Sequence, residues 1–295
     1  MTGRPSTDVR PITQPQTCPP KTQHTPPEER RRAGKAPYRH IIGIGDSNLP
    51  YPTPPSVISY SLFLLLSGLL FTLAERLWPR QPQPIARKGY ALDIVYILFN
   101  AEVVGALVSI WLGQMYGTHF LQWREPLGLT ALARQPEWLQ LAALLLVKDF
   151  LQWNIHNLLH RVPALWEFHK THHSTEVMDW LSNWRFHWFE IVFYQTILYL
   201  PANLLGMSPT VTFGCAVIST TIGHFAHANL RWRVGPLKYI INSPEMHLWH
   251  HVHPDAGPQN RNFAISLALW DWLFHTAYAP AQAPKRLGII DAKTT

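Results

Sequence analysis

The sequence predicts an all-α integral membrane helical bundle with four to five membrane segments and a histidine-rich helical cap on its cytoplasmic face. Three observations lead to this prediction: apolar runs of membrane-spanning length recur, tryptophans stand near their ends, and histidines repeat at helical spacing. The 295 residues are 47% apolar and 15% charged, which excludes a chain that is disordered throughout. Two cysteines and no CxxC pair exclude a disulfide scaffold and a thiolate metal site.

The formal net charge of +7 would suit a nucleic-acid partner. The 12% of aromatic residues and the long uncharged runs favour a lipid surface instead, so we expect a membrane partner and no nucleic acid. The first 55 residues hold 12 of the 26 prolines and lack an apolar run, which is typical of disorder. We therefore expect a Pro-rich basic tail, N-terminal membrane segments, a histidine-rich domain and a C-terminal tail over residues 1–55, 56–137, 138–280 and 281–295.

The membrane segments are predicted from apolar runs along the chain. Val57–Leu73 has 17 residues without a charge, and Ile94–His119 carries only Glu102. Trp138–Val147 begins a helix that we expect to continue to His160. Two shorter runs, 191–207 and 211–222, are separated by Ser208-Pro209 and fit a hairpin. The alternative is a soluble protein with buried core helices, but five such runs disfavour it.

Histidines are concentrated in the second half of the chain, where 12 of the 16 lie between His156 and His253. Four clusters have i, i+3 or i+4 spacing, so each presents its imidazoles on one face of a helix. The clusters are His156 and His160; His169, His172 and His173; His224 and His227; and His247, His250 and His251. We predict that these ten side chains are metal ligands.

Ten imidazoles are too many for one ion, whereas two ions would receive about five each. A structural zinc site would be expected to use cysteines, and Asn157 stands where the zinc-protease motif HExxH needs its glutamate. A bis-histidine haem would leave most of the ten unexplained. A nitrogen-rich di-iron centre that binds O2 fits best, although the ligands alone do not distinguish iron from zinc.

The order HxxxH, HxxHH, HxxHH among apolar segments resembles the fatty acid hydroxylase/sterol desaturase superfamily of integral membrane di-iron oxidases. The similarity covers about residues 140–278 and extends to Asp149-Phe150, Arg185-Phe186-His187 with Glu190, and Leu269-Trp270-Asp271. The chain departs from the usual family pattern at Trp188 (usually proline), Phe263 (usually tyrosine) and His275 (usually glycine).

The resemblance implies a membrane-bound oxidoreductase that uses O2 and two iron ions to hydroxylate or desaturate a C–H bond of a lipid. Such a reaction needs two electrons per turnover, and the chain has no haem, iron–sulfur or flavin motif. We therefore expect electrons from NAD(P)H through a separate reductase or carrier protein. The alternatives are a non-catalytic haem- or metal-binding membrane protein and a membrane zinc hydrolase.

Two further residues are candidates for the catalytic site. Asp149 lies seven residues before His156, on the same helical face, where it can orient an imidazole. The alternative is a pair with Lys148 or Arg161. His187 is interpreted either as a ligand or as a residue that supports one.

Basic residues set the expected orientation. Crossings at 57–77, 92–113 and 138–158 place His160 beside the loop 78–90, which carries Arg80, Arg87 and Lys88. By the positive-inside rule, this face is cytoplasmic. The tail with Arg30-Arg31-Arg32 would then lie outside, so we expect one of the first two segments to be re-entrant or interfacial.

Overall fold

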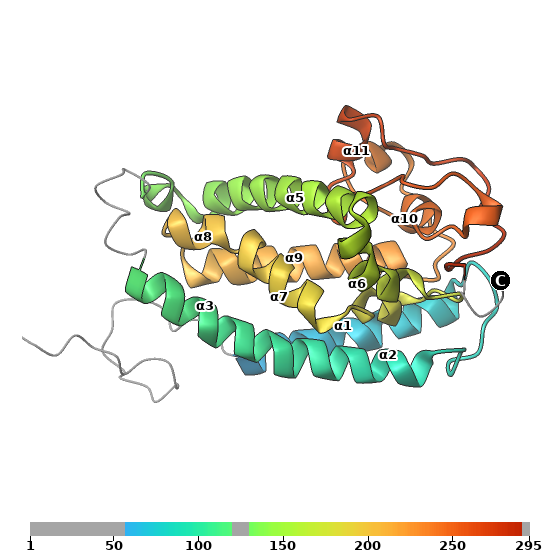
Figure 1. Cartoon of the computed structure of the whole chain (residues 1–295), viewed down its shortest axis with the longest axis horizontal. Helices are drawn as coiled ribbons and strands as arrows, with labels where there is room; N and C mark the ends of the chain where they lie inside the picture. The colour runs from blue at the N-terminus through green and yellow to red at the C-terminus, as the bar shows by residue number, and fades with distance from the viewer. Residues whose placement is uncertain (1–56, 120–129, 291–295) are drawn as a thin grey trace, which may run out of the picture. The chain divides into compact units, whose positions relative to one another are not determined.

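The computed structural model describes residues 57–119 and 130–290 (Figure 1), so the predicted tail over 1–55 lies outside the described residues. Within these ranges every regular element is helical. The β-type pairings there are two isolated bridges, Pro79 with Leu230 and Val252 with Leu287. The all-α prediction is therefore confirmed for the part of the chain that the structure describes.

Two stretches of the described helices are long and apolar enough to cross a membrane, Ser59–Leu77 and Tyr90–Leu112. The first lies in α1 (Val57–Leu77), and the second runs through α2 (Tyr90–Ile97), the π-helix η2 (Leu98–Val104) and into α3 (Gly105–His119). Leucines of α1 expose more than half of their surface, a pattern suited to lipid contact: Leu62, Leu65, Leu66, Leu69, Leu70, Leu73 and Leu77. Four to five membrane segments stay a prediction.

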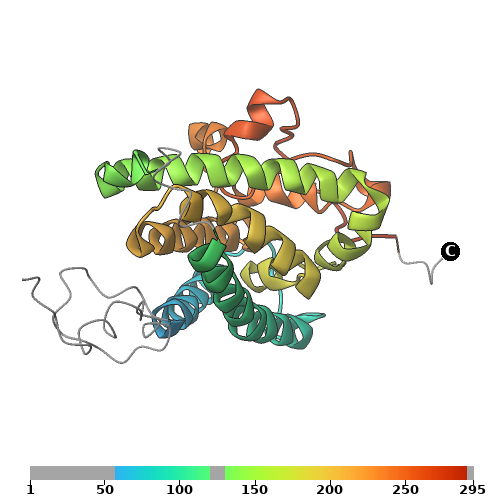
Figure 2. The same cartoon turned by 60° about the vertical axis from the view of Figure 1, so that its left-hand side comes forward.

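The remaining helices form the body on which the histidines are placed. They are α5 (Glu137–Arg161), α6 (Pro163–His173), α7 (Trp188–Leu198), α8 (Leu200–Leu204), α9 (Pro209–His227), α10 (Pro244–His250) and α11 (Leu269–Leu273), with 3-10 turns that include η3 (Leu132–Arg134) and η4 (Trp180–Trp184). α5 packs on α6, α7 and α9, while α3 packs on α7 and α1 on α9. Figures 1 and 2 show the resulting layers, with α5 on one side of α7 and α9 and the first three helices on the other.

Local sequence explains where the key helices begin and end. Val162 precedes a proline and adopts an extended conformation, so α5 stops there and α6 starts with Pro163 at its first position. Ser208 caps α9 by accepting a hydrogen bond from the Val211 N–H, and Pro209 again takes the first helical position. The short connection between α5 and α6 brings the first two histidine clusters to one end of the bundle.

A buried ion network ties the start of α2 to the segment before α7. Arg87 donates to Asp93 at 2.7 Å and to Asp179, and Arg185 donates to Asp93 at 2.5 Å. All four side chains are less than a tenth exposed. Because a broken buried ion pair is strongly destabilising, this network fixes α2 against the histidine end of the bundle.

Residues 281–290, which belong to the expected C-terminal tail, pack beside α10 and the residues that follow it. Leu287 is buried and pairs with Val252, the His253 N–H donates to the Arg286 carbonyl, and the Gly288 N–H donates to the His251 carbonyl. This segment therefore covers the last histidine triplet.

Candidate metal centre

The first histidine group combines side chains from three helices, His156, His160, His169, His173 and His250. One potential ligand atom from each lies within 4.8 Å of all the others. The Nε2 atom of His169 is central, at 3.0 Å from His156 Nε2, 3.1 Å from His160 Nε2 and 3.2 Å from His173 Nε2. Four of the five side chains are buried, and His160 is partly buried.

The second group consists of His172, His227, His247 and His251, all buried. His227 Nε2 lies 3.3 Å from His172 Nε2 and 3.1 Å from His247 Nε2, and His251 Nε2 lies 3.1 Å from His247 Nε2. The two groups adjoin, because the rings of His173 and His251 stack with centroids 4.4 Å apart. The arrangement thus offers two neighbouring metal positions.

The two HxxHH motifs divide their histidines between the groups in opposite ways. In α6, the i, i+4 pair His169 and His173 joins the first group, while His172 joins the second. At α10, the i, i+4 pair His247 and His251 joins the second group, while His250 joins the first. Each motif therefore bridges both metal positions.

Hydrogen bonds at Nδ1 fix the orientation of four ligand rings. Carbonyl and carboxylate oxygens accept, so each Nδ1 carries the proton and each Nε2 keeps a lone pair directed into its group. The pairs are His156 with the Phe263 carbonyl (2.6 Å), His169 with Glu190 Oε1 (2.8 Å), His227 with the Gly223 carbonyl (2.9 Å) and His250 with the Arg261 carbonyl (2.8 Å).

The donor geometry fits bound metal ions. His169 Nε2 has one lone pair but three imidazole neighbours, so hydrogen bonds alone cannot satisfy the group. The buried Nε2 of His250 has no hydrogen-bond partner. Nitrogens at about 2.1 Å from an octahedral ion stand roughly 3.0 Å apart, close to the spacing found here. Iron, copper and zinc all accept such imidazole ligands.

Burial also sets the protonation state of the ligands. Desolvation and the neighbouring imidazoles lower the pKa of the buried histidines of α6 and of the α10 triplet well below its ordinary value: His169, His172, His173, His247, His250 and His251. These rings are therefore neutral at pH 7, which is the form that binds metal.

His224 is the one predicted ligand that the structure places outside both groups. Its Nδ1 lies 2.9 Å from Ser67 Oγ, and its Nε2 accepts a hydrogen bond of 2.8 Å from Trp184 Nε1. The ring also contacts Trp180, with centroids 5.0 Å apart. Both nitrogens of His224 are thus used in packing α9 against α1 and η4.

Asp149 and His187 are also placed away from the ligand atoms. The Asp149 carboxylate accepts from the backbone N–H groups of Ser266 and Leu267, both at 3.0 Å, so it positions the loop before α11 rather than an imidazole. His187 caps α7, accepting from the Phe189 N–H at 3.2 Å. Neither role was expected.

Sequence reasoning missed the groups that orient the ligand rings. Glu190 was noticed only as part of the family resemblance, and its oxygen bonds His169. Asp271 accepts from the N–H groups of Phe263 and Ala264, both at 2.9 Å, and so places the Phe263 carbonyl against His156. The chain therefore uses the backbone of Phe263 here, and this contact does not depend on the hydroxyl that tyrosine would supply.

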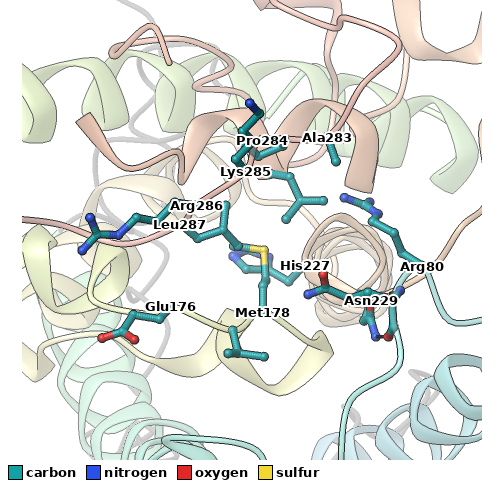
Figure 3. A pocket seen from close by; sticks show the side chains of 14 residues that line it. Arg80, Glu176, Met178, His227, Asn229, Ala283, Pro284, Lys285, Arg286 and Leu287 are labelled. Atoms are coloured by element: carbon teal, nitrogen blue, oxygen red, sulfur yellow. Dashed lines mark hydrogen bonds between the residues drawn. The ribbon is translucent and has the colours of Figure 1, made fainter. Parts of the chain in front are cut away.

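Two cavities reach the histidines from different directions. One of about 170 Å³ lies among the helices and is lined by His156, His169 and His172. The other, of about 250 Å³, reaches His227, and Figure 3 shows Arg80, Lys285 and Arg286 around it. An aromatic and aliphatic cavity and a basic pocket thus approach the same centre.

Comparisons with known proteins agree with this geometry. Residues 141–276 match the fatty acid hydroxylase family. The chain is 26% identical to the ornithine lipid hydroxylase OlsE of Rhizobium tropici over 247 residues, covering 81% of this chain and 72% of that protein. It is 28% identical to the human (Homo sapiens) alkylglycerol monooxygenase over 222 residues, covering 75% of this chain and 48% of the relative.

A third relative is a very-long-chain aldehyde decarbonylase of Oryza sativa subsp. indica, 24% identical over 72% of this chain and 36% of that protein. The chain thus spans half or less of the length of these last two relatives. No solved structure matches it significantly. The family match over residues 141–276 and the ornithine lipid hydroxylase and alkylglycerol monooxygenase relatives support the fatty acid hydroxylase/sterol desaturase superfamily for this part of the chain.

Proposed function

We propose that this protein is a membrane-bound, O2-dependent di-iron oxidoreductase that hydroxylates or desaturates a C–H bond of a lipid. The observation that carries the proposal is the convergence of nine imidazoles into two adjoining groups. Two relatives support the proposal, because one is named an ornithine lipid hydroxylase and the other an alkylglycerol monooxygenase.

The nine histidines of the two groups would hold the two iron ions, which supply O2 activation and the removal of hydrogen from the substrate. Glu190 and the carbonyls of Phe263, Gly223 and Arg261 hold four of the rings in the tautomer that binds metal. Phe263, fully buried, packs edge-on against His156, His160 and His250 and keeps water away from the first group. Asp149 would act by positioning the loop before α11, and His187 by capping the start of α7.

The substrate is proposed to enter the cavity lined by His156, His169 and His172. Aromatic and aliphatic side chains form much of the wall, including Trp184, Phe186, Ile191 and Leu198. Such a wall buries a hydrocarbon chain and excludes bulk water from the histidines. A lipid therefore fits this cavity better than a polar metabolite.

Electrons are proposed to arrive from NAD(P)H through a separate carrier protein. The basic pocket at His227 offers the approach, since Lys285 and Arg286 are exposed at its rim. An acidic carrier would be attracted to this face. The protein is further proposed to be multi-pass, with this face in the cytoplasm.

The test compares lipids from a host strain that lacks the gene, carrying either the wild-type gene or His172→Ala. We expect one lipid species to be converted only with the wild type and only under O2. Isotopically labelled O2 separates the reactions: hydroxylation leaves label in the lipid, whereas desaturation leaves it in water.

The same experiment separates the alternative functions. A zinc hydrolase would act without O2, and a haem- or metal-binding protein would change no lipid. Conversion that continues without O2, or that persists with His172→Ala, would contradict the proposal.

A further inference from the structure

The substrate cavity contains a buried lysine that the metal centre does not use and that the packing of the helices engages through one hydrogen bond. Lys148 lies in the middle of α5 and is only 6% exposed. It lines the same cavity as His156, His169 and His172. An ionisable group buried within a membrane bundle is costly to maintain and is therefore a candidate for binding.

The contacts of Lys148 leave donors unused. A lysine ammonium group has three N–H donors, and the one hydrogen bond found for Lys148 in the described residues goes to Ser219 Oγ at 3.2 Å. No carboxylate among the described residues forms an ion pair with it. The neighbouring Asp149 interacts with it over a longer distance, but its oxygens are occupied by the N–H groups of Ser266 and Leu267.

A second polar group in the cavity is also without a partner. Gln152 lies one helical turn after Lys148 and lines the same cavity, and its Oε1 atom is buried with no hydrogen bond. Lys148, Gln152 and His156 are spaced i, i+4 and i+8, so they lie along one face of α5. The eight residues from Lys148 to His156 correspond to about 12 Å along the helix axis.

We propose that Lys148 and Gln152 form a polar subsite that binds an oxygen-bearing group of the substrate, about 12 Å along α5 from the position of His156. Lys148 donates to an acceptor oxygen, either a hydroxyl or a carboxylate, and Gln152 Oε1 accepts from a hydroxyl. A plain hydrocarbon chain would leave both groups unpaired, so the subsite selects against it. The inference rests on the proposed lipid oxidation for the assignment of the histidine end as the reacting end.

The test measures binding and needs no turnover. The full-length, metal-loaded protein in mixed micelles is incubated with radiolabelled 1-hexadecanol, and palmitic acid or hexadecane is added as competitor. We expect the wild type to prefer both oxygen-bearing probes over hexadecane by about ten-fold or more, the size typical of a hydrogen bond to a charged group. Equal competition by all three probes would overturn the proposal without any variant.

Variants then test whether the preference for oxygen-bearing probes depends on Lys148 and Gln152. In Lys148→Met we expect the preference to fall to within about two-fold, whereas Lys148→Arg, which keeps the donors, retains it. Gln152→Leu should weaken the binding of 1-hexadecanol more than the binding of palmitate, because only the hydroxyl can donate a hydrogen bond to Gln152 Oε1. Lys88→Met is the matched control, since Lys88 is exposed and pairs with Glu176 outside the cavity. An unchanged preference in Lys148→Met would contradict the proposal.

Ratios measured within one variant do not depend on the fraction of folded protein. The result also distinguishes a failure of the subsite proposal from a failure of the proposed function. If probe discrimination is found without any lipid oxidation, the proposed function alone fails. If lipid oxidation is found without discrimination, the subsite alone fails.

Discussion

At the scale of single residues, His169 is the point on which the first histidine group converges. Its Nε2 atom lies within 3.2 Å of three other imidazole nitrogens. We expect His169→Ala to lower the iron content from two ions to about one per chain and to abolish lipid oxidation, because the remaining rings lose their common ligand. Elemental analysis of purified protein measures this change.

His224→Ala provides the matched comparison for that experiment. Both of its ring nitrogens are bonded to Ser67 and Trp184, so we expect this variant to keep two ions per chain. Loss of one ion from His224→Ala would show that His224 is a ligand after all.

Glu190 is the side chain that orients His169, through its Oε1 atom. Replacing it with leucine removes the acceptor for the Nδ1 proton, so we expect roughly a 10–100-fold loss of iron affinity. Glu190→Gln keeps an acceptor oxygen and should lose less. Iron titration of metal-depleted protein measures both, with the exposed Glu167→Gln as control. Equal affinity in Glu190→Leu and the wild type would contradict the orienting role.

These residues also show how far the sequence could predict the site. Nine of the ten histidines lie in the two groups, and helical spacing contributes by putting i, i+3 and i+4 side chains on one face. The spacing of His224 and His227 satisfied the same rule, but His224 lies one turn deeper, where Trp184 and Ser67 bind it. Glu190 was not assigned a role, because the ring that it orients, His169, lies 21 residues away. Asp271 was not assigned one either, because it acts on His156 through the backbone of Phe263.

At the scale of helices, the end of α11 explains one departure from the family pattern. His275 has φ +59°, in the left-handed region that glycine adopts without strain. The Thr276 N–H donates to the Asp271 carbonyl at 2.9 Å and the His275 N–H to the Trp272 carbonyl at 3.5 Å, which is a Schellman motif. Glycine is the usual residue at this position of the motif.

We therefore expect His275→Gly to stabilise the protein by about 1 kcal/mol, the strain of a non-glycine residue in the left-handed region. The side chain of His275 is exposed, so little packing is lost. The midpoint of thermal unfolding checks this. His275→Ala is the control, since it removes the ring but keeps the strain; a gain of equal size in both variants would point to the ring instead.

Helix boundaries were predictable where proline or a capping serine marks them, as at Pro163 and Ser208. The segment 281–290 was not, because its order comes from pairing with Val252 and His251, which are distant in sequence. α5 carries Lys148 and Asp149 in its middle and is not one of the two candidate spans, so its crossing of the membrane stays a prediction.

At the scale of the whole molecule, each of the two candidate spans has one of its ends at the histidine end of the bundle: the first span ends there and the second begins there. The loop after α1 pairs with the end of α9, since the Arg80 N–H donates to the Asn229 carbonyl at 3.0 Å and the Arg231 N–H to the Trp78 carbonyl at 3.2 Å. The Arg30-Arg31-Arg32 run of the N-terminal tail ends 25 residues before α1, beyond the distance over which flanking charges orient a segment, whereas Arg39 lies 18 residues before α1 and within that distance. The run of three arginines is therefore weak evidence against a cytoplasmic histidine end, and Arg39 is the tail arginine that opposes it.

The other end of the bundle lies beyond the start of α5. His156 follows Glu137 by 19 residues, so the two are about 28 Å apart along the helix, close to the roughly 30 Å thickness of a bilayer core. Ala131 lies just before the start of α5, and Ala281 lies beside α10 at the histidine end. Both residues are exposed. They form a matched pair of positions for a reporter cysteine.

We expect a cysteine at Ala281 to react with a membrane-impermeant maleimide only after cells are permeabilised, and a cysteine at Ala131 to react in intact cells. The background lacks Cys18 and Cys215, the two native cysteines. The expected pattern follows from the basic residues at the histidine end, Arg80, Lys88, Arg231, Arg233, Lys285 and Arg286, because such charges are retained on the cytoplasmic side. Labelling of Ala281→Cys in intact cells would reverse the orientation, and labelling of both positions from one side would show that α5 does not cross the membrane.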